Sequence, residues 1–200
     1  PWRPDSLYPF PHLSGTGVAY KLLQALYQAL EKDGPDNRIL ELVALGTVAD
    51  MQSLLGENRY LVSRGLEELN RTSRPGIQEL IKVSGLIKGK IDSEDLSWTL
   101  GPRLNAAGRI DHALLSYDLL FSKTSKEAEE KAQGLEELNS QRQTLTQEAY
   151  EKAKEQVIPD SPLIFVQGNF PRGVIGIVAG RLSREFYRPA LVVQEGDEFF

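Results

Sequence analysis

A carboxylate at the end of an apolar segment is the first candidate for chemistry. Residues 39–45 are almost entirely aliphatic, and four small or aliphatic residues carry the chain on to Asp50 without proline or charge. We expect the Asp50 carboxylate to be partly buried and therefore to need compensation. A helix cap or an ion pair would supply it, and so would Mg2+ or Mn2+, which prefer carboxylate oxygens. Spacing alone favours the structural role and leaves the metal role open.

A second block sets two guanidinium groups and an amide among small residues. Within residues 101–111, Arg103, Asn105 and Arg109 alternate with glycine and alanine. Small residues let the backbone approach a ligand, and the planar fork of arginine matches phosphate oxygens. The pattern predicts a phosphate-binding surface. Pairing of the two arginines with acids such as Asp111 is an equally good interpretation of this block.

The composition is that of a globular protein with one or two cores. Of 200 residues, 40% are hydrophobic and 26% charged, and the absence of cysteine excludes disulfides, thiolate zinc sites and thiol nucleophiles. No apolar run approaches the roughly 20 residues that cross a bilayer. We expect a cytoplasmic protein without membrane contact. The proline-rich start without methionine, and an end that reads as a strand, a Gly196–Asp197 turn and a second strand, predict an excised segment.

The charge distribution is uneven. The formal net charge of −5 argues against a domain that coats a polyanion. Between Arg71 and Arg109, however, seven basic residues face four acidic ones, whereas residues 1–70 carry six basic and nine acidic residues. A local basic segment in an acidic chain suits an enzyme that holds a few phosphates.

The first 100 residues predict a series of helices. Ser14 can cap a helix over about 16–32, whose apolar face comprises Val18, Leu22, Ala25, Leu26 and Ala29. A turn at 56–58 precedes a helix over 59–70, and Pro75 suits the first turn of a helix over 76–83. The acidic run 92–95 lacks the length and glycine of a calcium loop, so it predicts a helix N-terminus.

A long charged helix leads into a different kind of structure. Alanine and leucine recur at three- and four-residue intervals over 124–157, which predicts an interdomain helix roughly 50 Å long despite Gly134. A coiled-coil dimer is the alternative, but the seam is short and rich in alanine, so we expect a monomer. Strands at 163–166 and 190–193 around a helix at 174–187 then predict an α/β unit. In that unit Gly173, Gly176 and Gly180 suit close helix packing.

Four motifs together carry a family resemblance. The segments SGTGVAYKL, GTVADMQSLLGENRYLV, GPRLNAAGRID and GVIGIVAGRL span nearly the whole chain. They resemble the RecJ single-stranded-DNA exonucleases of the DHH phosphoesterase family. The resemblance implies an α/β fold that is mostly helical here. Residues 1–120 are similar to the later part of a DHH catalytic domain, 121–159 to its connecting helix, and 160–200 to the beginning of an α/β DHH-associated domain.

The resemblance also implies an activity and roles for particular residues. It implies metal-dependent 5′-to-3′ hydrolysis of single-stranded DNA in repair and recombination, with Asp50 as a catalytic ligand of Mn2+ or Mg2+. It places Arg103, Asn105 and Arg109 near the DNA backbone. The other metal ligands of the family come from upstream motifs and its glycine–histidine motif from downstream, so we expect this chain alone to be inactive. Asn169–Phe170 stands where many relatives carry Trp-His, so the resemblance assigns no histidine to that loop.

Two alternatives to this function stay open from the sequence. A DHH relative that degrades short RNA or cyclic dinucleotides would use the same metal site. A noncatalytic DHH-fold scaffold would bind DNA or protein partners in replication without cleaving, although a scaffold has no chemical need for Asp50. Protein partners in repair or replication are expected under either the exonuclease or the scaffold interpretation.

Overall fold

The chain folds into two compact units, one of helices and one of mixed α and β structure, and most of it is helical, as predicted. The computed structural model describes residues 5–110 and 112–196. Within these, unit 1 comprises residues 5–105 and 115–136, and unit 2 comprises 106–110, 112–114 and 137–196. Asp197 and the predicted second strand lie outside the described residues. The predicted boundaries at 120 and 159 stay a prediction.

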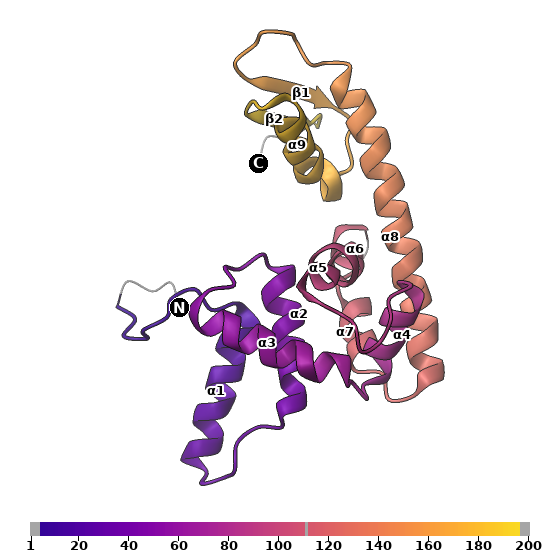
Figure 1. The fold of residues 1–200 in the computed structure, drawn as a ribbon. Helices are drawn as coiled ribbons and strands as arrows, with labels where there is room; N and C mark the ends of the chain where they lie inside the picture. Colours follow the sequence, from indigo (N-terminus) through magenta and orange to yellow (C-terminus); the bar gives the residue numbers. More distant parts are fainter. Residues whose placement is uncertain (1–4, 111, 197–200) are drawn as a thin grey trace. The chain divides into compact units, whose positions relative to one another are not determined.

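Unit 1 is built from helices (Figure 1). They are α1 (Gly15–Ala29), η1 (Asn37–Ile39), α2 (Leu40–Ala49), α3 (Gly56–Asn70), α4 (Pro75–Val83), α5 (Ser93–Asp95), the π-helical turn η2 (Leu96–Leu100), most of α7 (Leu114–Leu120), and the first parts of α6 (Gly101–Ile110) and α8 (Ser125–Lys154). Helix α1 ends three residues before its predicted end, and α3 begins at Gly56, inside the predicted turn. Gly56 itself has a positive φ of 51°, which glycine adopts readily where a chain turns.

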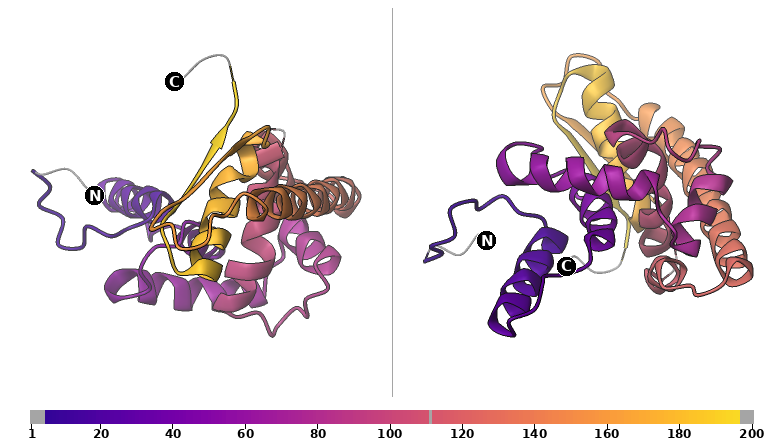
Figure 2. Two further views of the ribbon diagram at one scale, coloured as in Figure 1. Left: turned by 90° about the horizontal axis from the view of Figure 1, so that it is seen from above. Right: turned by 60° about the horizontal axis from the view of Figure 1, so that its bottom comes forward.

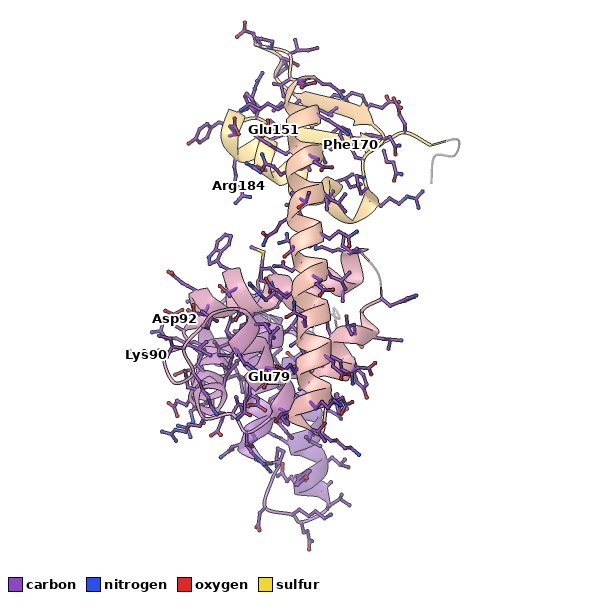
Figure 3. All side chains as sticks on the ribbon, turned by 90° about the vertical axis from the view of Figure 1, so that its right-hand side faces the viewer. Glu79, Lys90, Asp92, Glu151, Phe170 and Arg184 are labelled. Atoms are coloured by element: carbon purple, nitrogen blue, oxygen red, sulfur yellow. The ribbon has the colours of Figure 1, made fainter. Side chains whose placement is uncertain are left out.

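The predicted helix starts are confirmed at three places. Ser14 caps α1, its Oγ accepting a hydrogen bond from the Gly17 N–H at 3.0 Å. Pro75 occupies the first turn of α4. Asp92, labelled in Figure 3, forms a capping box with Asp95 at the start of α5. Each cap satisfies backbone N–H groups that a helix leaves without partners, so these starts follow from local sequence.

Helix α2 forms the centre of unit 1. Its buried residues surround the helix rather than lining one face: Leu40, Glu41, Val43, Ala44, Leu45, Thr47 and Val48. Helix α3 approaches so closely that a Cβ added to Gly65 would lie 2.2 Å from the Leu40 carbonyl oxygen. On another side, the Thr47 hydroxyl is hydrogen bonded to Ser14 at 2.8 Å. Because α2 is packed on several sides, its position is fixed, and so is the backbone position of the residue at its end.

The extended segment before α1 is tied to α3 through Glu57. The Tyr8 hydroxyl donates to Glu57 Oε2 at 2.7 Å, and Lys21 Nζ lies 2.9 Å from Oε1. Burial opposes the charged form of Glu57, but the two hydrogen bonds outweigh it and lower the pKa of this carboxyl below its ordinary value. The ionised carboxylate therefore helps to hold the segment in place.

The apolar face predicted for α1 is exposed. Leu22 is 71% exposed, and Val18, Leu26 and Leu30 are also exposed. The C-terminal half of the helix extends away from the rest of unit 1 (Figures 1 and 2). Periodicity identifies an apolar stripe, but it does not show which other segment covers that stripe. Among the described residues, none covers this one.

Unit 2 contains a strand–helix–strand motif. Strands β1 (Ile164–Gly168) and β2 (Ala190–Gln194) pair in parallel, with Ile164 opposite Ala190, and α9 (Arg172–Phe186) connects them. The core consists of Ala149, Tyr150 and Ala153 of α8 together with Ile164, Val166, Phe170, Val174, Val178 and Leu182. Helix α9 ends at Phe186, one residue earlier than predicted, and Tyr187 after it adopts the left-handed conformation.

Helix α8 is continuous over 30 residues, about 45 Å, and belongs to unit 1 at its start and unit 2 at its end. Gly134 does not interrupt it, and a Cβ there would make only an ordinary contact with Leu115 at 3.7 Å. The predicted pair of Glu127 with Lys131 forms at 2.6 Å. Within the described part of the chain, no helix is both long and apolar enough to span a membrane.

Candidate functional site

Asp50 is the residue that follows the last turn of α2. Its backbone N–H donates to the Gly46 carbonyl oxygen at 3.1 Å, and Met51 then turns the chain with a φ of 54°. The side chain is exposed, which corrects the expectation of partial burial. Apolar residues up to Val48 are buried because they lie on α2, whereas the chain leaves the core at the end of the helix. Water therefore satisfies the carboxylate, and burial gives no argument for a partner.

The surroundings of Asp50 also do not support the structural alternatives. The carboxylate lies at the C-terminal end of a helix, where the helix dipole is negative and disfavours an anion. Among the described residues, no lysine, arginine or histidine forms an ion pair with it. Its side chain contacts Gln52, whose Nε2 donates to Oδ2 at 2.8 Å. Gln52 thus holds one of the two carboxylate oxygens.

The described residues contain no group of three or more histidine, cysteine, aspartate or glutamate side chains that could hold a metal ion. Asp50 is thus a single oxygen donor here. Mg2+ is octahedral and is bound through one or two carboxylates together with waters and substrate phosphates. An exposed carboxylate that is held by a hydrogen bond fits one position of such a site.

Arg103 forms an ion pair within unit 1. Its Nε and Nη2 contact the two carboxylate oxygens of Glu136, with 3.1 Å between Nη2 and Oε1, and its Nη1 donates to the Thr99 carbonyl oxygen at 2.9 Å. The arginine side chain is 15% exposed. The interpretation that Arg103 pairs with an acidic residue is therefore correct, although that residue is Glu136 of α8. Asp111, the partner suggested by the sequence, lies outside the described residues.

Asn105 and Arg109 are both exposed on α6. Asn105 belongs to unit 1, and no hydrogen bond of its side chain is found among the described residues. Arg109 belongs to unit 2, where its Nη1 donates to the Gly173 carbonyl oxygen at 3.1 Å. These two side chains keep most of their donors available to a ligand, unlike Arg103.

The start of α9 lies directly against the end of α6. A Cβ added to Gly173 would lie 2.1 Å from the Arg109 carbonyl oxygen, which confirms the close packing predicted for this glycine. The same prediction is wrong for Gly176 and Gly180, which have no atom within 4 Å of an added Cβ. Phe170, labelled beside β1 in Figure 3, is buried in the core of unit 2.

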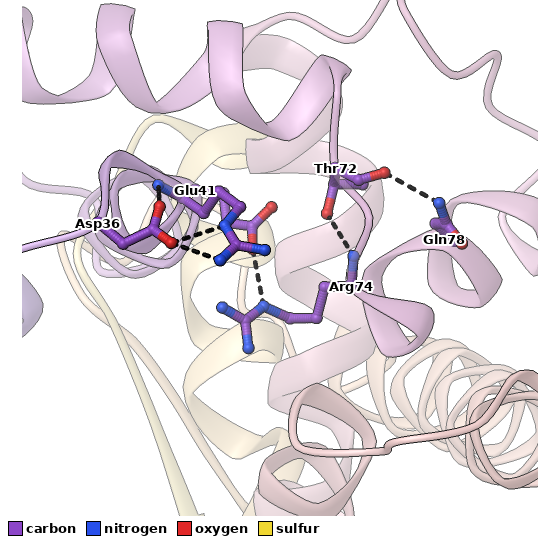
Figure 4. Close-up of polar contacts among 6 residues, drawn as sticks. Asp36, Glu41, Thr72, Arg74 and Gln78 are labelled. Carbon is purple, nitrogen blue, oxygen red and sulfur yellow. Dashed lines mark hydrogen bonds and ion pairs between the residues drawn. The ribbon is translucent and has the colours of Figure 1, made fainter.

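Sequence reasoning missed a buried ion pair at the other end of α2. Glu41 is 2% exposed, and Arg74 Nε donates to its Oε1 at 2.7 Å (Figure 4). Nearby, hydrogen bonds from the Arg38 side chain lower the pKa of Asp36. A pocket of about 390 Å³ lies beside these four residues. A single charge inside the aliphatic run 39–45 was the signal that could have identified Glu41.

No protein-family profile matches the chain. The "Single-stranded-DNA-specific exonuclease RecJ" of Bacillus subtilis is 43% identical over 202 residues, which cover 99% of this chain and 25% of the relative. The crystal structure of RecJ from Thermus thermophilus in complex with Mg2+ superposes with a TM-score of 0.87 and 32% identity, over 96% of this chain and 30% of that one. Over nearly its whole length, the chain is therefore similar to one part of RecJ.

The match to the RecJ family extends to a second solved structure. A RecJ exonuclease bound to manganese gives a TM-score of 0.81 and 33% identity over 90% of this chain and 46% of that one. The predicted resemblance and the helical α/β fold are confirmed by these similarities. The chain spans about a quarter of the length of the Bacillus subtilis relative and 36% of the RecJ of Dickeya dadantii.

Proposed function

We propose that this chain is the part of a RecJ-type, metal-dependent single-stranded-DNA exonuclease that supplies Asp50 to the metal site. The observation that carries the proposal is an exposed carboxylate, oriented by Gln52, at the end of a helix that is buried on several sides. A ligand must be held in position by its supporting residues, and α2 provides that support. The RecJ relatives that bind Mg2+ or Mn2+ make these the cofactors of the proposal.

The proposed reaction is hydrolysis of a DNA phosphodiester in the 5′-to-3′ direction. Bound Mn2+ or Mg2+ would supply an activated water and stabilise the attacking and leaving oxygens. The chain's own contribution is Asp50 as a fixed oxygen ligand, with Gln52 holding one carboxylate oxygen through a hydrogen bond of 2.8 Å. Because Asp50 is one ligand of several, the isolated chain has no complete centre.

We assign different roles to the three side chains of α6. Asn105 and Arg109 contact phosphate groups of the strand, since both are exposed. Arg103 acts mainly as a positioning residue, because Glu136 and the Thr99 carbonyl oxygen already engage three of its nitrogen atoms. The proposal extends to a monomer that works in the cytoplasm in DNA repair and recombination, with repair or replication proteins as partners.

A chimera tests the proposal. The aligned 202 residues of Bacillus subtilis RecJ are replaced by this chain, and cleavage of long single strands, labelled at either end, is followed with Mn2+. We expect release of the 5′ label first, loss of activity with Asp50→Ala, and full activity with the exposed control Asp33→Ala. Wild-type activity of Asp50→Ala, with the protein folded, would return Asp50 to a structural role.

The same chimera distinguishes the alternative functions. Cleavage of dinucleotides or cyclic dinucleotides in preference to long strands would favour the short-RNA or cyclic-dinucleotide interpretation. A folded chimera that binds DNA without cleaving any substrate would favour the scaffold. The isolated 200-residue chain is expected to be inactive, so metal-dependent cleavage by that purified chain would contradict the incomplete centre.

A further inference from the structure

Trp98 presents a large aromatic surface to solvent from a rigid turn. Its side chain is 72% exposed, whereas Leu96 and Leu100 on either side of it in η2 are 1% and 0% exposed. Tryptophan is among the residues that bury the most area when a protein folds. The two leucines anchor the turn in the core, and the π-helical geometry, which occurs frequently at functional sites, leaves Trp98 outside.

The exposed indole lies beside the residues around Asp50. A pocket of about 230 Å³ is lined by Trp98, Val48 and Gln52, together with Leu54, Ser93, Glu94 and Ser97. Gln52 is the residue that donates to Asp50 Oδ2 at 2.8 Å. The pocket is therefore separated from the candidate metal ligand by a single side chain.

The turn packs directly against α2. A Cβ added to Gly101, the residue that follows the turn, would lie 3.4 Å from the Ala49 Cβ at the end of α2. All these residues belong to unit 1. Trp98 is thus held at a constant position relative to the end of α2, as a residue that positions a substrate must be.

We propose that this pocket binds one unpaired base of the DNA strand, stacked on the indole of Trp98, while a phosphate of the same strand lies at the metal site of Asp50. The proposal deepens the exonuclease function and rests on it. Aromatic side chains provide stacking surfaces for bases of any sequence. A base in a duplex is already stacked and paired, so a platform of this kind selects single strands.

The charges around the pocket favour a base over a phosphate as its occupant. Glu94 lines the pocket and Asp50 lies next to it, so an anionic group would be repelled from both sides. A neutral base has apolar faces for the indole and polar edges for the side chains of Gln52, Ser93 and Ser97. Glu94 can in addition accept a hydrogen bond from an exocyclic amino group.

Fluorescence of Trp98 in the isolated chain tests the stacking directly. The chain contains two tryptophans, so Trp2→Phe makes Trp98 the one reporter. We expect its emission to be that of an exposed indole and to be quenched saturably by a ten-nucleotide single strand in Mg2+, at strand concentrations up to the millimolar range. A duplex of the same sequence and an abasic strand of equal length should not quench it.

Three outcomes of this titration would overturn the proposal. Equal quenching by the abasic strand would mean that the phosphates, and not a base, perturb the indole. No quenching by any single strand up to millimolar concentration would mean that the pocket does not hold a base. Self-association of the chain that masks the indole without DNA would instead identify a second copy as the occupant.

Kinetics in the chimera separate this proposal from the function on which it rests. We expect Trp98→Leu to raise KM for single strands about tenfold with kcat within about twofold, Trp98→Phe to retain most binding, and Tyr60→Leu, an exposed aromatic on α3, to change neither. An active chimera with unchanged KM in Trp98→Leu would reject the platform alone. Quenching in the isolated chain with an inactive chimera would reject the exonuclease and keep the base site.

Discussion

Replacing Asp50 by asparagine should stabilise the isolated chain. The Asp50 carboxylate follows the last residue of α2, where the unpaired carbonyl groups of the helix place a partial negative charge. Among the described residues no cation forms an ion pair that offsets this repulsion. Asparagine removes the charge and keeps an oxygen that can accept the Gln52 hydrogen bond, so the substitution tests the electrostatic cost by itself.

The expected gain follows from the helix dipole. A charge of the unfavourable sign in the last turn of a surface helix costs about 0.3–1 kcal/mol at low ionic strength, so Asp50→Asn should raise the free energy of unfolding by that amount. For a chain of this size, it should raise Tm by about 1–3 °C. In 0.5 M salt, where the Debye length is only a few ångströms, most of the gain should disappear.

Urea unfolding followed by circular dichroism, at low and high salt, measures this difference. Asp33→Asn is the matched control, because Asp33 is exposed but lies outside every helix, and it should change stability much less. A loss of more than about 0.5 kcal/mol in Asp50→Asn would refute the reasoning. So would a gain that does not depend on salt. If the Asp50 carboxylate lowers the stability of the isolated chain, its presence is consistent with selection for a metal ligand.

Four other substitutions test the packing and charges of the fold. Arg74→Met should cost about 3–5 kcal/mol in urea unfolding, because it leaves the buried carboxylate of Glu41 unpaired, and the double change to methionine should recover most of that loss. Gly65→Ala should cost at least 1–3 kcal/mol, because the new Cβ would lie 2.2 Å from a carbonyl oxygen of α2, whereas Gly176→Ala, in open space, should stabilise by about 0.5–1 kcal/mol. The lowered pKa of Glu57 predicts that its contribution is complete above about pH 4.3, the unfolded value, and is lost as the pH falls through the lower folded value. Stability curves of the wild type and Glu57→Gln should therefore converge in acid, and parallel curves would contradict this.

Local signals in the sequence were sufficient for three helix starts. Ser14, Pro75 and Asp92 act through hydrogen bonds or backbone geometry within three residues of themselves, so their roles can be predicted from neighbouring residues alone. Gly173 was also predicted correctly as a close contact, although its neighbour on α6 could not be named from the sequence.

The candidate residues could be named from the sequence, but their geometry could not. The sequence by itself singled out Asp50, Arg103, Asn105 and Arg109 as candidates, through motifs that resemble a known family, and their roles in metal and phosphate binding stay a prediction. Only the tertiary structure decided that Asp50 is exposed, that Arg103 pairs with Glu136 33 residues away, and that Trp98 stands beside the Asp50 region. The physical reason is that exposure and long-range pairing depend on which distant segments pack together, and local periodicity does not specify that packing.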